Sequence, residues 1–169
     1  KNLDFTGFTG TFAGSSSISI YGNLTFVAGM TKTHSGGITF RATSGTKTIT
    51  TNGISVPNAI TFNGSGGTFQ LQDNLTVGAS RNWTLTAGTF DPNGKTVSFT
   101  GQGVQMIING AFTFYNLTFT GSSTKTDDLA FASNVTVSNA FTVNGNSVIN
   151  RVLISSSVIG TSRTLTVAT

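Results

Sequence analysis

The chain of 169 residues contains no cysteine and no glutamate, and it has only one histidine and two prolines. Without cysteine it can form no disulfide framework, no thiolate metal site and no cysteine nucleophile. With five aspartates as its only acidic side chains, it has few candidates for the paired carboxylates of a glycoside hydrolase. We therefore expect a protein that is not an enzyme and that needs no cofactor or metal ion.

Charge is also scarce, at 8% of the residues against a usual share of about 25%. Nine basic residues give a net charge of +4, but they are scattered along the chain and form no basic run. This distribution is not typical of a nucleic-acid-binding surface, so we expect no nucleic-acid partner. No apolar run approaches the roughly 20 residues of a membrane helix, so we expect no insertion into a membrane.

β-Branched residues are abundant, because 31 Thr, 12 Val and 11 Ile make up about a third of the chain. Their side chains suit the pleated surface of a strand, and 21 Gly, 19 Ser and 15 Asn supply frequent turns. The 14 Phe residues lie in alternating patterns, which excludes a disordered chain. The composition predicts a folded, all-β protein.

A strand phrase recurs along the chain, most clearly as Asn-Leu-Thr-Phe at positions 23–26 and 116–119. Variants begin at positions 2, 37, 59, 74, 96 and 134, so the steps between successive starts are uneven. Such repetition is typical of stacked coils. The apolar residues of the phrase share one face of a strand and are predicted to point inward. They are Leu24, Phe26, Ile38, Phe40, Ile60, Phe62, Leu75, Val77, Val97, Phe99, Leu117, Phe119, Val135 and Val137.

A second set of alternating strands lies between the phrases and adds further candidates for the core. This set includes Ile18 and Ile20, Phe69 and Leu71, Trp83 and Leu85, Phe112 and Phe114, Phe141 and Val143, and Val152 and Ile154.

Two all-β folds fit these strands. In a parallel, right-handed β-helix with coils of about 15–22 residues, equivalent side chains stack, which explains the recurring phrase. In an antiparallel β-sandwich, hairpin turns would join the strands, and the Asn-Gly pairs of the sequence fit such turns. Because Asn-Gly also serves at corners between coil faces, we predict one β-solenoid segment over residues 1–169, with the sandwich as the alternative.

Strand phrases lie close to both ends of the sequence, and no polar capping helix is recognisable. The open ends of a solenoid need caps or neighbours. We therefore expect the chain to be part of a longer protein or a processed piece, or to associate with copies of itself as a homo-oligomer.

Asp73 and Asp91 lie about one coil apart and are the best candidates for paired catalytic carboxylates. Asp73 precedes a strand phrase, however, and Asp91 opens an Asp-Pro-Asn-Gly turn, so we predict ordinary corner roles for both. The adjacent Asp127 and Asp128 are predicted to point to opposite faces of a strand. His34 has no predicted partners for a triad or a metal site, and we expect it in a surface loop.

Six asparagines lie in Asn-x-Ser/Thr sites, the acceptor pattern for glycans. Most of them coincide with the repeat phrase, so we interpret them as a by-product of the repeat, with amides that satisfy backbone groups at corners. Paired threonines could form an ice-binding array, but their spacing is too irregular for regular ranks. The six asparagines are Asn23, Asn63, Asn74, Asn82, Asn116 and Asn134.

Three aromatic residues are candidates for contact with sugars, namely Tyr21, Trp83 and Tyr115. An aromatic side chain with a polar atom suits a surface that is partly apolar and partly wet. Trp83 and Tyr115 also lie in strand patterns, which favours core packing for both.

Residues 150–167, and the runs 59–71 and 85–96, resemble stretches of repeat-rich β-solenoid structural proteins of tailed bacteriophages. Bacterial β-helical surface adhesins use comparable phrases and resemble the chain more weakly. The phage resemblance implies a part of the virion surface, such as a tail fibre, a spike or a capsid decoration. It also implies other virion proteins, copies of the chain or a host-surface glycan as partners, and it supplies no catalytic motif.

We therefore predict a non-enzymatic structural or adhesive module at a virion surface. Three alternatives stay open: an extracellular adhesin or filament module of a bacterial cell surface, a polysaccharide-degrading spike, and an ice-binding solenoid.

Overall fold

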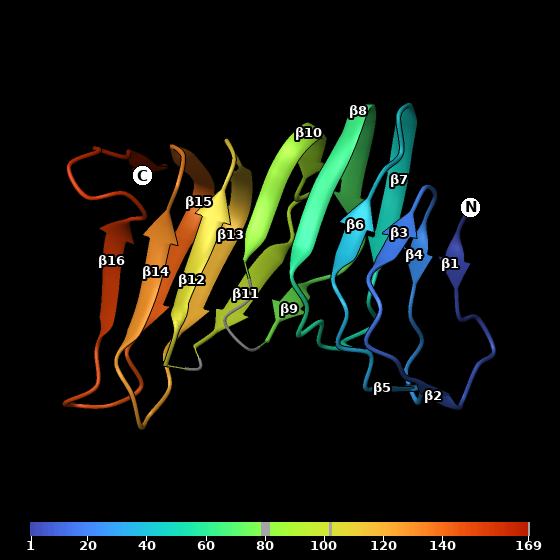
Figure 1. The fold of residues 1–169 in the computed structure, drawn as a ribbon, viewed down its shortest axis with the longest axis horizontal. Helices are drawn as coiled ribbons and strands as arrows, with labels where there is room; N and C mark the ends of the chain where they lie inside the picture. Colours follow the sequence, from blue (N-terminus) through green and yellow to red (C-terminus); the bar gives the residue numbers. More distant parts are fainter. Residues whose placement is uncertain (79–81, 102, 169) are drawn as a thin grey trace.

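The chain folds as a parallel β-solenoid of about 7 turns, in a computed structural model that describes residues 1–78, 82–101 and 103–168. None of the described residues is helical, and every strand pair among them is parallel. The coils stack along the long axis of the molecule, from β1 at one end to β16 at the other (Figure 1). The predicted β-helix is confirmed, and the antiparallel sandwich is excluded.

Each coil has three faces, and the strands of successive coils follow one another along each face. The first face contains β1 (Leu3–Asp4), β4 (Leu24–Thr25), β7 (Gly45–Thr50), the second halves of β8 (Ile60–Leu71) and β10 (Trp83–Asp91), the starts of β13 (Thr113–Thr120) and β15 (Val135–Asn144), and β17 (Leu165–Val167). The second face contains β2 (Thr11–Phe12), β5 (Thr31–Lys32), β9 (Leu75–Val77), β11 (Thr96–Thr100) and the second halves of β13 and β15. The third face contains β3 (Ile18–Ile20), β6 (Ile38–Phe40), the first halves of β8 and β10, β12 (Gln105–Asn109), β14 (Asp127–Phe131) and β16 (Val152–Ser156).

The stacking explains the uneven spacing of the repeat phrase. Phrases that begin at positions 2 and 23 pair on the first face, those at 37 and 59 on the third, and those at 74, 96 and 116 on the second. The longer steps therefore stay on one face. The shorter steps, which run from 23 to 37, from 59 to 74 and from 116 to 134, move the chain to another face.

Coil length is the part of the predicted fold that needs correction. Ile18 pairs with Ile38 in the next coil, and Val137 pairs with Val167, so a full turn takes from about 20 to about 30 residues. The predicted lower limit of about 15 residues is wrong, because the shorter steps measured a change of face rather than a full turn. The predicted upper limit of about 22 residues is also wrong, since Leu24 pairs with Ile49 and Val137 pairs with Val167.

The core consists of columns of inward-facing side chains. All fourteen apolar residues that the phrase predicts to point inward are exposed by 2% or less. Aromatic rings continue the stacking from coil to coil, with ring centroids 5.3 Å apart between Phe40 and Phe62 and again between Phe62 and Trp83. Most of the second predicted set is buried in the middle of the rod, although Leu85 is only partly buried. In the last coil, Ile154 is 44% exposed.

In the described part of the chain, five asparagine side chains link one coil to the next through their amide oxygen and a backbone N–H. In each case Oδ1 accepts a hydrogen bond from a backbone N–H of the next coil, at 2.9 to 3.2 Å. These bonds satisfy N–H groups at the corners, as predicted for the asparagines of the phrase. We call this set the asparagine ladder: Asn2 accepts from Asn23, Asn23 from Thr48, Asn74 from Thr96, Asn82 from Ile107, and Asn134 from Thr164.

Removal of one rung of the asparagine ladder is expected to weaken the whole stack. Asn23→Ala should lower the free energy of unfolding by about 1 kcal/mol, because the partly buried N–H of Thr48 loses its acceptor. Urea unfolding followed by circular dichroism measures this change.

Two further variants serve as controls. Asn23→Asp keeps an acceptor oxygen at the same place and should retain most of the stability. Asn109→Ala removes an exposed asparagine that makes no side-chain hydrogen bond in the described part of the chain, and its effect should stay within about 0.5 kcal/mol. Equal losses in Asn23→Ala and Asn109→Ala would show that the ladder bond adds nothing.

Candidate functional site

The two aspartates considered as a catalytic pair lie at corners and accept hydrogen bonds there. The carboxylate of Asp73 accepts from the backbone N–H of Thr51, at 3.0 Å to each oxygen. The carboxylate of Asp91 accepts from the backbone N–H of Asn93 and from the side-chain amide of Gln70, both at 2.8 Å. The predicted corner roles are confirmed, since each carboxylate holds backbone or side-chain donors around a turn.

Asp127 is buried and also serves a corner. Its carboxylate accepts from the backbone N–H groups of Gly103 at 2.6 Å and Ser122 at 2.5 Å, and the residue is only 1% exposed. Asp128 is partly exposed, and its carboxylate accepts from the Ser155 hydroxyl at 2.9 Å. The two neighbours point to opposite sides of β14, as the alternation of a strand predicts.

The described ranges contain no group of three or more His, Cys, Asp or Glu side chains that could hold a metal ion. No described helix is long and apolar enough to cross a membrane.

His34 lies inside the solenoid, so its predicted place in a surface loop is wrong. The residue is 3% exposed, and its ring stacks on Phe12 with centroids 4.7 Å apart. Its Nε2 lies 2.9 Å from the carbonyl oxygen of Ser16, in the preceding coil. The segment Thr-His-Ser-Gly-Gly has the composition of a loop, but it crosses a corner where the ring folds inward.

Lys32 and Asn58 extend this contact into a polar network across three coils. The ammonium of Lys32 donates to the carbonyl oxygen of His34 at 2.8 Å and to the amide oxygen of Asn58 at 2.5 Å. Asn58 is fully buried, and its amide group donates to the carbonyl oxygens of His34 at 3.2 Å and Gly36 at 2.5 Å. The bonds run to backbone carbonyls and between the two side chains, which is the arrangement of a structural network.

Partial burial changes the acidity of the lysine in this network. Loss of surrounding water disfavours the charged amine and lowers the pKa of Lys32 to about 8. No signal in the sequence marked this site, because its members come from three coils and lie far apart along the chain.

This lowered pKa predicts that stability depends on pH. An unfolded lysine has a pKa of about 10.4. Between this pH and about pH 8, the unfolded chain therefore binds more protons than the folded one. Stability should therefore rise as the pH increases through this range. Since the amine is only half buried, screening by solvent limits the expected gain to about 1 kcal/mol.

Thermal unfolding between pH 7 and 10 measures this rise, and Lys32→Met provides the control. The variant lacks the titrating amine and should lose the increase, whatever its absolute stability. An equal rise in both proteins would assign the effect to other groups.

Of the three aromatic candidates for sugar contact, two lie at the surface. Tyr21 is 57% exposed and Tyr115 is 38% exposed, so both rings can meet a ligand. Trp83 is fully buried, and its ring centroid lies 5.3 Å from those of Phe62 and Phe112. Its predicted core packing is confirmed, and a glycan contact of Trp83 is ruled out because the side chain reaches no surface.

Core packing of Tyr115 was predicted wrongly for a local reason. Its neighbour Phe114 takes the inward position and is fully buried. The pairing of β13 with β15 shifts register between Phe114 and Asn116, where the chain turns from the first face to the second. Tyr115 lies at this irregularity and points outward.

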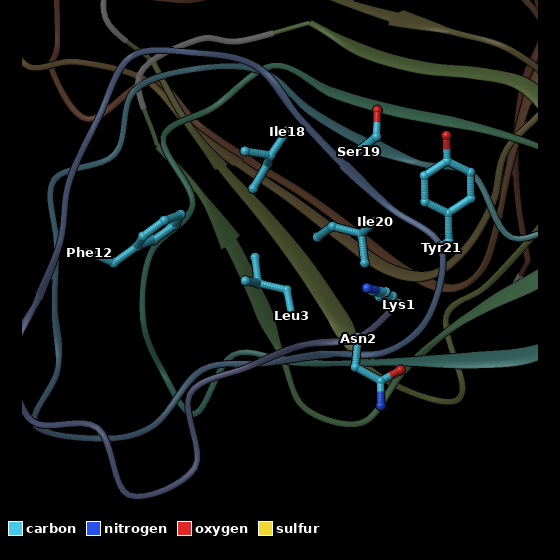
Figure 2. Close-up of a pocket in the computed structure, with 8 residues that line it drawn as sticks. All are labelled: Lys1, Asn2, Leu3, Phe12, Ile18, Ser19, Ile20 and Tyr21. Atoms are coloured by element: carbon cyan, nitrogen blue, oxygen red, sulfur yellow. The ribbon is translucent and has the colours of Figure 1, made fainter.

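An apolar hollow of about 550 Å³ opens at the N-terminal end of the rod. Figure 2 shows the side chains of Leu3, Phe12, Ile18 and Ile20 around it, with Tyr21 at the rim. These residues belong to the first coil. β4, β5 and β6 pair with one side of this coil, and no described strand lies on its other side. The hollow is therefore the exposed cross-section of the core at this end.

Comparison of the chain with protein-family models, with curated proteins and with solved structures finds no match. The likeness to phage structural proteins or to adhesins thus rests on the sequence phrases alone and stays a prediction.

Proposed function

We propose that this chain is a non-enzymatic structural module, a rigid rod that acts as a spacer or adhesive element on the surface of a particle. One observation carries the proposal: the same contacts repeat from coil to coil along the rod. Columns of apolar side chains fill the interior, and the asparagine ladder joins the corners. Since each inner coil is held by both neighbours, such a stack resists bending and local unfolding.

The environment of the acidic residues and of His34 supports a role without catalysis. Asp73, Asp91 and Asp127 use their carboxylates to bind donors at corners. His34 is buried against Phe12. A general acid needs a carboxyl group that can reach a substrate, whereas these groups serve the fold.

We propose the surface of a bacteriophage particle as the location, as part of a tail fibre, a spike or a capsid decoration. The support is the resemblance of residues 59–71, 85–96 and 150–167 to structural proteins of tailed phages. Many copies on one particle would add weak contacts with a host surface by avidity, with Tyr21 and Tyr115 as the exposed aromatic candidates for glycan contact.

Cryo-electron microscopy of the source particle tests the location. The expected result is density for a three-faced solenoid of about 7 turns at a regular site on the virion. Density on a bacterial cell envelope would replace the phage assignment with that of a surface adhesin.

Incubation of the purified chain with host-surface polysaccharide tests the absence of catalysis. We expect no release of oligosaccharides. A separate assay of retention on host cells tests the aromatic contacts, and the double variant Tyr21→Ala, Tyr115→Ala should be retained several-fold more weakly. Val104→Ala, which removes an apolar side chain that is 55% exposed, should bind host cells like the unmodified chain. Oligosaccharide release that Asp73→Asn or Asp91→Asn abolishes would instead establish a polysaccharide-degrading spike.

A further inference from the structure

We propose that the corner around Tyr115 is a binding site for an acidic glycan, which would lie along the rod with one sugar ring against the tyrosine. The inference rests on the proposed adhesive role and deepens it, because it assigns the glycan contact to one corner and names the chemistry of the ligand. This corner joins the first face to the second, and the chain forms a further coil on each side of it.

Tyr115 supplies the apolar part of the proposed site. Its side chain is 38% exposed, and its hydroxyl group makes no hydrogen bond within the described part of the chain. β13 pairs with β11 on one side and with β15 on the other, so the ring is exposed although both edges of its strand are covered. An aromatic ring with a polar end suits a ligand that is apolar on its face and polar at its edge, as a sugar ring is.

A row of polar side chains runs from coil to coil at the same corner and includes Asn116, which follows Tyr115 in the sequence. The Asn74 amide oxygen accepts from the backbone N–H of Thr96 at 2.9 Å, and the Thr96 hydroxyl oxygen accepts from the Asn116 amide at 3.1 Å. The Asn116 amide oxygen accepts in turn from the Asn139 amide at 2.7 Å. We call these four residues the polar row.

The polar row is held in place and still has groups to offer a ligand. Its internal bonds fix the side chains before a ligand arrives, which lowers the entropic cost of binding. The hydroxyl hydrogen of Thr96 and the amide hydrogens of Asn74 have no acceptor in the described part of the chain, and the amide oxygen of Asn116 has a second lone pair. The row therefore presents donors and an acceptor together, and sugar hydroxyl groups can use both.

Lys95 adds a positive charge to this corner and thereby favours an acidic ligand. Its carbonyl oxygen accepts from the backbone N–H of Asn116 at 3.4 Å, which places it in the coil next to Tyr115. Its ammonium makes no hydrogen bond or ion pair within the described ranges, and the carboxylate of Asp91, in the preceding turn, accepts hydrogen bonds from other residues. An unpaired cation beside an exposed ring suits a sugar that carries a carboxylate.

The polar row also sets the direction of the ligand. Its members lie on successive coils, and neighbouring strands are about 4.8 Å apart. An extended glycan laid along the rod would therefore meet a polar side chain at each coil. Tyr115 would stack on one sugar ring, the polar row would bind hydroxyl groups of this sugar and the next, and Lys95 would pair with a carboxylate.

Titration calorimetry with a panel of oligosaccharides tests the ligand class. The panel contains oligosaccharides of uronic and sialic acids, each beside the same oligosaccharide with its carboxyl groups reduced to alcohols. We expect an acidic oligosaccharide to bind, its reduced form to bind several-fold more weakly, and added salt to weaken only the acidic one. Equal affinity for the two forms, or no binding of any member at its highest soluble concentration, would overturn the proposal.

Substitutions locate the site. Tyr115→Ala and Lys95→Met should each weaken binding several-fold, and Lys95→Met should also remove most of the salt dependence. The matched controls are Tyr21→Ala, on an exposed tyrosine of the first coil, and Lys125→Met, on an exposed lysine at another corner. Both should bind like the unmodified chain, and losses as large as those of Tyr115→Ala and Lys95→Met would contradict the assignment to this corner.

A matched pair of substitutions at Thr96 tests the polar row. Thr96→Ser keeps the hydroxyl group and should retain binding, whereas Thr96→Val removes it and should weaken binding several-fold, with circular dichroism to show that both variants fold. Equal binding by the two would show that the row does not contact the ligand and would overturn the proposed site. Failure of these binding experiments would leave the rod's structural role intact, because microscopy of the particle tests that role separately.

Discussion

The register of one coil on the next is the constraint on which the rest of this structure depends. Parallel pairing places a residue beside its equivalent one coil away, so an inward side chain always meets another inward side chain. Ile60 lies between Ile38 and Trp83 in this way. A slip of one residue would turn such a column outward, and the fold therefore requires every coil to repeat the same alternation.

Corners are where this constraint is hardest to satisfy, because the chain leaves the strand and its backbone donors lose their partners. The chain solves the problem with short polar side chains. The asparagine ladder supplies amide oxygens, and Asp73 and Asp127 supply carboxylates to N–H groups around a turn. Asp73, Asp91, Asp127 and Asp128 thus use their carboxylates as hydrogen-bond acceptors within the fold.

The same repetition makes the ends of the rod unlike its middle. An inner coil covers its neighbours on both sides, whereas Ile18 begins a column and Ile154 ends one without such cover. The two ends are also unlike each other, because the first coil surrounds a hollow and the last coil carries exposed apolar turns.

The sequence by itself determined the inward columns, because a phrase with period-2 alternation leaves only one side of each strand for the core. Its repetition favoured the parallel stack, and the structure excluded the antiparallel alternative. It also determined the corner roles of Asp73 and Asp91, which follow from turn chemistry next to strands. Only the tertiary structure decided which phrases share a face, since that depends on how many residues each corner uses. It likewise decided the burial of His34 and the exposure of Tyr115, because one lies at a corner that folds inward and the other at a shift of register. The network of Lys32 and Asn58 joins residues of different coils, and sequence order carries no sign of such contacts until the coils are stacked.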